Sequence, residues 1–270
     1  MREMTQRPTR VSAIVPVFNE ETTVALVVER LLQCGLVDEV VCVNDGSTDR
    51  SLEVLRMFGD RITVVDLQPN RGKGHALAEG IRSAAGDIVA FFDADLTNLS
   101  SEHVAALLEP ITSGRARAVL GIPGGDLAFS LVSVLASGAA DSVGAKFTGE
   151  RAYFRRDLLP HAARMEATRF GVEVYLNGQF ASVDTVIVTL PRLAALGKQD
   201  KHGWPLAVKE YSGEVREVAS EIARTGRARL GESYRARWRT DPTGAEPARR
   251  ARTTEGRHPS SLTEPPPGSE

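Results

Sequence analysis

Two aspartates, Asp93 and Asp95, directly follow an uninterrupted apolar run from Ile88 to Phe92. Alternate side chains of a strand point to the same side, so two carboxylates one residue apart at a strand end lie close together. Carboxylates that close repel each other, and one stays protonated unless a cation lies between them. Mg²⁺ and Mn²⁺ take such oxygen ligands and usually share them with substrate phosphates. The pair therefore predicts a Mg²⁺ or Mn²⁺ ion that holds a diphosphate.

Three other expected strands also end in polar loops. These are "PVFNEE" at 16–21, "NDGSTD" at 44–49 and "NRGKGHALAEG" at 70–80. In an open α/β sheet, ligands collect at the carboxyl ends of the strands. The three loops and the aspartate pair are therefore expected at one edge of the sheet.

Each loop also has a purely structural interpretation. Asn19 could begin a helix, because Asn is a good cap. Asp45 and Gly46 could form a turn, and Gly72 and Gly74 could serve only the backbone. The functional interpretation is favoured because all the loops meet at one place.

Alternating strands and helices must position these loops. Continuous apolar runs predict buried strands, and runs with one apolar face predict helices. The expected strands span 11–17, 39–44, 61–67, 87–92 and 117–121, and the expected helices span 21–33, 48–58, 73–85 and 101–112. This alternation predicts an α/β fold with a mostly parallel central sheet flanked by helices.

The second half of the chain is less regular. We expect helices over 126–140 and 205–224, short helical pieces over 153–161 and 171–178, and a strand within 181–191. From about residue 240 the chain holds no aliphatic residue larger than Ala except Leu262. Such a composition cannot offset chain entropy by burial, which predicts a disordered tail.

Composition excludes several classes of protein. The formal net charge of −2 argues against a general nucleic-acid binder. Cys34 and Cys42 have no metal-binding spacing, which favours a reduced, cytoplasmic compartment. The longest uncharged stretch, Leu127 to Ala140, is shorter than the roughly 20 apolar residues of a membrane-spanning helix. It could still rest on a membrane surface.

Common nucleotide and nucleophile motifs are missing. Gly72 and Gly74 are not followed by the third glycine of GxGxxG, so a Rossmann dinucleotide site is disfavoured. The sequence contains neither GxxxxGK[ST] nor the GxSxG of a serine hydrolase.

The four loop motifs together resemble those of family 2-type glycosyltransferases with the GT-A (nucleotide-diphospho-sugar transferase) fold. The matching segments are "VSAIVPVFNEE", "VVCVNDGSTD", "NRGKGHALAEG" and "DIVAFFDADL". "DADLTNLSSEHVAALLEPI", "FTGERAYFRRDLL" and "FGVEVYLN" are similar to glucosyl-3-phosphoglycerate synthases, and dolichyl-phosphate mannose synthases share the first four motifs.

The resemblance implies a set of residues that bind a sugar nucleotide. They are Pro16, Phe18, Glu20, Asp45, Ser47, Lys73 and Asp93. Phe18 and Glu20 would line the base and ribose. Asp45 and Ser47 would meet the base, and Lys73 would reach the diphosphate.

The resemblance also implies catalytic and metal-binding residues. Asp93 and Asp95 would contact the sugar and the metal, and Glu173, in "GVE", matches a position near the acceptor. These three are the implied catalytic residues. His202, in "KQDKHGW", would join Asp95 as a metal ligand, or it is a surface histidine beside Trp204.

The acceptor and the stereochemistry stay open. Arg151, Arg155 and Arg156 could grip an anionic acceptor, or they are a solvated helix start. An inverting reaction needs a general base, for which Glu173 and Asp141 are candidates. In a retaining reaction the leaving diphosphate could take the proton.

The expected function is metal-dependent transfer of a sugar from a UDP- or GDP-linked donor to a hydroxyl of a small acceptor, which could be anionic. The alternatives are transfer to a polyprenyl phosphate at a membrane surface and a sugar-nucleotide binder without turnover. The expected layout is a flexible N-terminus (1–10), a nucleotide-sugar-binding half (11–122), an acceptor-binding half with a C-terminal helix (123–238) and a disordered tail (239–270). Peripheral membrane contact and a homodimer remain open.

Overall fold

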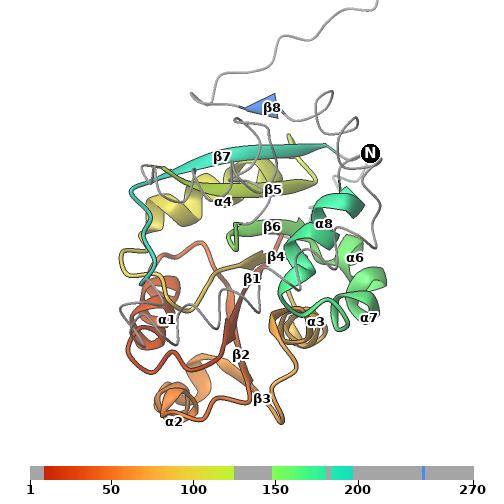
Figure 1. The fold of residues 1–270 in the computed structure, drawn as a ribbon. Helices are drawn as coiled ribbons and strands as arrows, with labels where there is room; N and C mark the ends of the chain where they lie inside the picture. The colour runs from red at the N-terminus through yellow and green to blue at the C-terminus, as the bar shows by residue number, and fades with distance from the viewer. Residues whose placement is uncertain (1–8, 125–147, 181–183, 197–238, 241–270) are drawn as a thin grey trace, which may run out of the picture.

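A computed structural model describes residues 9–124, 148–180, 184–196 and 239–240 (Figure 1). Its strands are β1 (Val11–Val17), β2 (Glu39–Asp45), β3 (Thr63–Leu67), β4 (Ile88–Phe91), β5 (Ala118–Gly124), β6 (Arg151–Phe154), β7 (Thr185–Pro191) and β8 (Arg239–Thr240). Its α-helices are α1 (Val24–Gln33), α2 (Ser51–Arg56), α3 (Lys73–Ser83), α4 (Ser101–Thr112), α6 (Arg155–Leu158), α7 (Ala162–Met165) and α8 (Val172–Phe180). Single 3₁₀ turns lie at Gly59–Arg61, Leu159–His161 and Arg169–Gly171.

The strands form one sheet in the order β3-β2-β1-β4-β6-β5-β7-β8. Neighbours run parallel except at β6, which is antiparallel to both β4 and β5. Val17 pairs with Asn44, and Ile14 pairs with Phe91, so β1, β2 and β4 end at the same edge. The predicted α/β fold with a mostly parallel sheet is confirmed, and the loops after these strands emerge together.

Helices cover both faces of the sheet (Figure 1). One core joins α1, α2 and α4 to alternate strand residues such as Val15, Cys42 and Ala90. A second core joins α3, α7 and α8 to the residues between them, such as Ile14 and Val41. Because alternate side chains face opposite sides, a strand buried on both faces reads as one continuous apolar run.

The first two helices begin later than predicted because their starts form loop contacts. Residues 21–23 make a turn, and the Glu20 carbonyl accepts hydrogen bonds from the amides of Thr23 (3.2 Å) and Val24 (3.0 Å). Before α2, the Asp49 carboxylate accepts from the Ser51 amide (2.9 Å) and hydroxyl (2.6 Å). The predicted starts at 21 and 48 are therefore wrong by about one turn, which lengthens the loops at the sheet edge.

The predicted helical piece at 153–161 is wrong at its start. Tyr153 and Phe154 belong to β6, where they pair with Val89 and Ile88 of β4. The helical part begins at Arg155. A four-residue strand has too little length for a period to show in sequence, and its partners come from distant parts of the chain. The predicted helix at 171–178 and the strand within 181–191 are confirmed as α8 and β7.

Several expectations fall outside the described residues. They are the flexible N-terminus except for residues 9–10, the helices at 126–140 and 205–224, Asp141, His202 and most of the tail. Arg239–Thr240, at the start of the predicted tail, pair with β7. In the part of the chain that is described, no helix has the length and apolarity to cross a membrane.

Candidate active site

The loop after β1 is bonded to the loop after β2. The Asn19 amide donates to Ser47 Oγ at 3.0 Å, and the Thr48 amide donates to Asn19 Oδ1 at 2.8 Å. The Glu20 amide donates to Ser51 Oγ at 2.7 Å. Asn19 has a φ of 57°, a left-handed conformation that Asn tolerates better than most residues. These bonds hold two of the predicted nucleotide loops as one unit.

Asp45 holds the loop after β3 in place. Its buried carboxylate accepts hydrogen bonds from the amides of Arg71 (3.0 Å) and Gly72 (2.7 Å). At Gly46, whose φ is 72°, a Cβ would lie 2.5 Å from the backbone nitrogen of Asn70, so this close approach needs glycine. The contact of Asp45 with a base stays a prediction, and its role in the structure is to position the segment that leads to Lys73.

Lys73 lies at the centre of the candidate site. Its Nζ is 2.7 Å from Asp93 Oδ1 and 2.9 Å from Glu173 Oε1. The three residues come from the start of α3, the segment after β4 and the first turn of α8. Burial alone would lower the pKa of Lys73, but the charges and hydrogen bonds of Asp93 and Glu173 outweigh it and raise the pKa. The lysine is therefore a fixed positive charge between two carboxylates.

The second acid of the pair, Asp95, lies where the chain returns after β7. The Leu196 amide donates to the Asp95 carbonyl at 2.9 Å, and Leu96 forms an antiparallel bridge with Ala195. The Asn98 side chain reinforces this contact by accepting from the Ala194 amide at 2.8 Å. The chain beyond β7 thus starts beside Asp95. The predicted ligand His202 lies six positions after Leu196, outside the described residues.

Glu150 is a buried acid of this site that the sequence interpretation did not include. It lies just before β6, is 4% exposed, and accepts from the Thr148 hydroxyl at 2.7 Å. Burial and the charge of Asp93 raise its pKa to about 7, against the lowering effects of the Thr148 hydrogen bond and of Lys73. The sequence shows only that "FTGERAYFRRDLL" contains an acid at position 150. It does not show that this acid is buried, because burial cannot be predicted from so short a segment.

The remaining predicted nucleotide residues lie on the first two loops. Phe18 is 43% exposed, which suits an aromatic ring that stacks on a base. Pro16, in β1, is half-buried, and Glu20 accepts from the Thr23 hydroxyl at 3.2 Å. Their contacts with a nucleotide stay predictions.

The three arginines of the "TGERAYFRR" segment do not form one anion-binding patch. Arg151 is fully buried, and its guanidinium donates to Asn177 Oδ1 at 2.8 Å. Arg155 donates to the carbonyls of Ile81 (2.8 Å) and Arg82 (3.1 Å) at the end of α3. Neither open alternative, a joint grip on an anionic acceptor or a solvated helix start, describes Arg151 and Arg155, because both arginines bond other elements of the fold.

Two carboxylates and a nearby excess of acid suit a divalent cation. Asp93 and Glu173 bond one lysine, so this cluster holds one more carboxylate than ammonium. Within the described ranges, no group of three or more His, Cys, Asp or Glu side chains could hold a metal ion. A complete metal site built on Asp93 and Asp95 therefore needs a ligand from elsewhere, and substrate phosphates commonly supply one.

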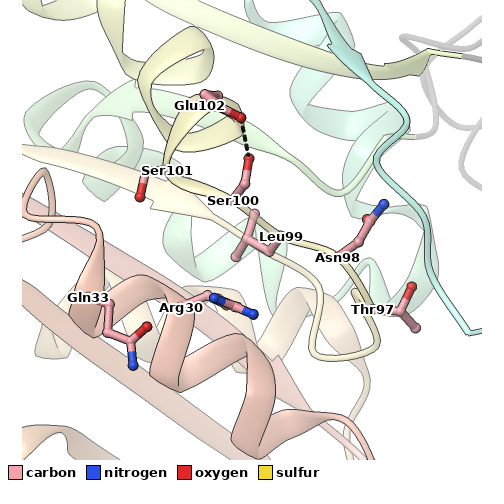
Figure 2. Close-up of a pocket in the computed structure, with 8 residues that line it drawn as sticks. All are labelled: Arg30, Gln33, Thr97, Asn98, Leu99, Ser100, Ser101 and Glu102. Atoms are coloured by element: carbon pink, nitrogen blue, oxygen red, sulfur yellow. Dashed lines mark hydrogen bonds between the residues drawn. The ribbon is translucent and has the colours of Figure 1, made fainter.

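A hollow with a volume of about 490 Å³ lies between α1 and the segment 97–102 (Figure 2). Its lining includes Arg30 and Gln33 of α1, and the Ser100 hydroxyl donates to Glu102 at 3.3 Å. It contains none of the predicted site residues. The candidate site is therefore defined by its side chains and not by this hollow.

Similar proteins of known structure share this fold. A glucosyl-3-phosphoglycerate synthase from Mycobacterium tuberculosis, crystallised with Mn²⁺, UDP-glucose and phosphoglyceric acid, superimposes with a TM-score of 0.64. The sequences are 26% identical, and the match covers 81% of this chain and 80% of that one. A structure of the same enzyme with Mg²⁺ and UDP gives a TM-score of 0.63 at 24% identity, covering 80% and 79% of the two chains. The GT-A fold expected from the motifs is confirmed.

Curated relatives match a shorter segment. The undecaprenyl-phosphate 4-deoxy-4-formamido-L-arabinose transferase of Pectobacterium carotovorum is 38% identical over 112 residues, which are 38% of this chain and 34% of that protein. The glucosyl-3-phosphoglycerate synthase of Mycolicibacterium smegmatis is 36% identical over 108 residues, or 37% and 36% of the two chains. This chain thus spans about a third of the length of these relatives.

The model of the family "Glycosyl transferase family 2" matches residues 12–159. That segment starts in β1, contains all four loops and the Asp93–Asp95 pair, and ends after β6. The chain therefore belongs to glycosyl transferase family 2.

Proposed function

We propose that this protein is a metal-dependent glycosyltransferase that moves a hexose from a UDP-linked donor to a hydroxyl of a small acceptor. The observation that carries the proposal is the position of Lys73 Nζ, within 3 Å of both Asp93 and Glu173. This fixed charge lies at the sheet edge where the four loops meet. A UDP-linked donor is favoured because the M. tuberculosis structure with the same fold contains UDP-glucose.

Mg²⁺ or Mn²⁺ would be held by Asp93 and Asp95, with His202 as the proposed third ligand. When bound, the ion would stabilise negative charge on the leaving diphosphate. Lys73 would add a second positive charge at the same place, and Asp93 and Glu173 already hold it in position. Such preorganisation requires no rearrangement during the reaction.

Glu173 would act on the acceptor side. Its side chain is largely buried, and it lies in the first turn of α8. A charged carboxylate there can accept a hydrogen bond from an attacking hydroxyl and orient it. In this proposal, residues 11–122 bind the sugar nucleotide and residues 123–238 bind the acceptor.

Relatives with two kinds of acceptor bear on the acceptor class. One is named as a transferase to undecaprenyl phosphate and another as a synthase of glucosyl-3-phosphoglycerate. We favour a small acceptor because the likeness in fold to the glucosyl-3-phosphoglycerate synthase of M. tuberculosis covers most of both chains. Transfer to a polyprenyl phosphate is the second candidate, supported by the 38% identity over 112 residues.

A binding and turnover panel tests the proposal. Thermal shifts are measured with UDP-, GDP- and dTDP-sugars, with and without Mn²⁺, because a ligand of the folded state raises its stability. We expect a Mn²⁺-dependent shift with a UDP-sugar, and Asp95→Ala should remove the metal-dependent part. Sugar release is then followed with 3-phosphoglycerate, glycerate or an undecaprenyl phosphate in detergent. A shift that is equal in Asp95→Ala would overturn the metal assignment, and binding without transfer to any acceptor would favour a non-catalytic binder.

A further inference from the structure

Gly149 lies against the carboxylate of Asp93. A Cβ added at Gly149 would be 2.1 Å from Asp93 Oδ2 and 2.5 Å from both Cγ and Oδ1. Ordinary van der Waals contact of such atoms begins at about 3.4 Å. Any side chain at this position would therefore displace the carboxylate by more than an ångström.

Backbone conformation does not explain the glycine. Gly149 has no φ in the left-handed range, unlike Gly46 and Gly72. An alanine there would therefore meet no left-handed backbone strain. The obstacle to a side chain at Gly149 is thus the carboxylate of Asp93, which already occupies that space.

The segment that carries Gly149 is held rigidly from both ends. The Gly121 amide donates to the Glu150 carbonyl at 2.9 Å, which ties the segment to β5. The buried Arg151 donates through Nε to the Thr148 carbonyl at 2.7 Å and through its terminal nitrogen to Asn177 of α8. These hydrogen bonds hold the backbone of the segment, whereas the side chain of Asp93 is about a third exposed, so the carboxylate is the part that would move.

We propose that Gly149 is a positioning residue, which by lacking a side chain sets where the Asp93 carboxylate lies between Lys73 and the proposed metal. The part of this inference that concerns metal binding by Asp93 rests on the proposed function. Its geometric part concerns the contact between Asp93 and Lys73, which are 2.7 Å apart, and can be measured without any ligand. A shift of more than an ångström that carries Oδ1 away from Lys73 would take that contact beyond hydrogen-bonding distance.

The test is Gly149→Ala, with Gly178→Ala as the matched control. Gly178 lies in α8, where an added Cβ would meet nothing within 4 Å. We expect both variants to fold, with wild-type circular dichroism, because the clash at Gly149 is with the end of a side chain. Gly149→Ala should weaken Mn²⁺-dependent binding of UDP-glucose at least tenfold, whereas Gly178→Ala should bind as the wild type does. Wild-type binding by Gly149→Ala would overturn the proposal.

A double-mutant cycle separates an effect through Asp93 from a general effect. In an Asp93→Ala background, Gly149→Ala should cause no further loss of binding. An equal loss in both backgrounds would show that Gly149 acts elsewhere and would overturn the proposal.

A ligand-free measurement distinguishes this inference from the proposed function. An amine-reactive reagent acylates lysine side chains, and peptide mass spectrometry measures the rate at which Lys73 is acylated. Gly149→Ala should raise that rate, because the ammonium loses a partner, and Gly178→Ala should leave it unchanged. An unchanged rate in Gly149→Ala would overturn the geometric part even if the enzyme binds UDP-glucose. A raised rate in a protein that binds no sugar nucleotide would support the positioning and refute the proposed function.

Discussion

The regions before and after residues 125–147 are built differently. Residues 9–124 alternate strands and helices, and their loops are bonded to one another, as in the contacts of Asn19 with Ser47 and of Asp45 with Gly72. The described residues 148–180 and 184–196 contain the strands β6 and β7, the helix α8 and shorter helical pieces. The first region is a preformed frame, and the second adds Glu150 and Glu173 to it.

The two regions meet along α3. At Gly74 a Cβ would lie 2.2 Å from the Met165 carbonyl oxygen and 2.5 Å from Thr168 Oγ1, so this part of α3 has no room for a side chain. One residue earlier, Lys73 bonds Asp93 of the first region and Glu173 of the second. The same helix thus packs the regions together and carries the charge that links their acids.

The largest effect is expected from removing that link. Lys73→Ala removes the ammonium between Asp93 and Glu173, and with it a charge that would stabilise the leaving diphosphate. Sugar transfer should fall by about 10²–10³-fold, the range seen when one preorganised donor is lost. Initial rates at saturating donor and metal measure it.

Lys73→Arg is the control for charge alone. It keeps the cation but not the compact ammonium that fits between the two acids, so its rate should lie between those of Lys73→Ala and the wild type. A wild-type rate for Lys73→Ala would show that the link between the two regions is only structural.

Replacing Glu150, in the second region, should change how the free energy of unfolding depends on pH. The pKa of Glu150 is about 7 in the folded chain, against an ordinary value of 4.5. The folded protein therefore keeps a proton that the unfolded chain releases, and the free energy of unfolding falls as the pH rises from 4.5 to 7. The loss is up to about 3 kcal/mol. Urea unfolding of Glu150→Gln in metal-free buffer should show a shallower fall than the wild type.

Glu29→Gln, at an exposed acid of α1, controls for the loss of a carboxylate elsewhere and should follow the wild-type curve. Parallel curves for Glu150→Gln and the wild type would contradict the burial of a protonated acid in the second region.

A smaller effect is expected where the two regions pack. Gly74→Ala places a methyl group against the backbone of Met165 and should lower the free energy of unfolding by about 1–3 kcal/mol, as overpacking does. Gly178→Ala, in open space on α8, should be neutral or stabilising by up to about 1 kcal/mol, because Ala favours helix. Thermal or urea unfolding measures both, and equal stabilities would mean that the regions are not packed as closely as described.

Much of the first region could be predicted because its signals are local. A strand buried on both faces is a continuous apolar run, and a polar motif directly after it must lie at the sheet edge. The sequence alone therefore predicts that Asp45, Lys73 and Asp93 lie on neighbouring loops. Helix starts were less predictable, because the residues before α1 bond across to the residues before α2: the amides of Glu20 and Glu21 donate to Ser51 and Asp49.

The sequence by itself determined the parallel sheet, the order of the loops and the acid pair that follows β4, since each depends on residues adjacent in the chain. Only the tertiary structure decided that β6 inserts antiparallel, that Arg151 is buried, that Glu173 bonds Lys73, and that the charges of Lys73 and Asp93 act on Glu150. Those outcomes depend on contacts between segments far apart in sequence. Burial also determines the partners of a charged side chain: the buried Arg151 bonds Asn177 of α8, whereas an exposed arginine is free to bind a ligand.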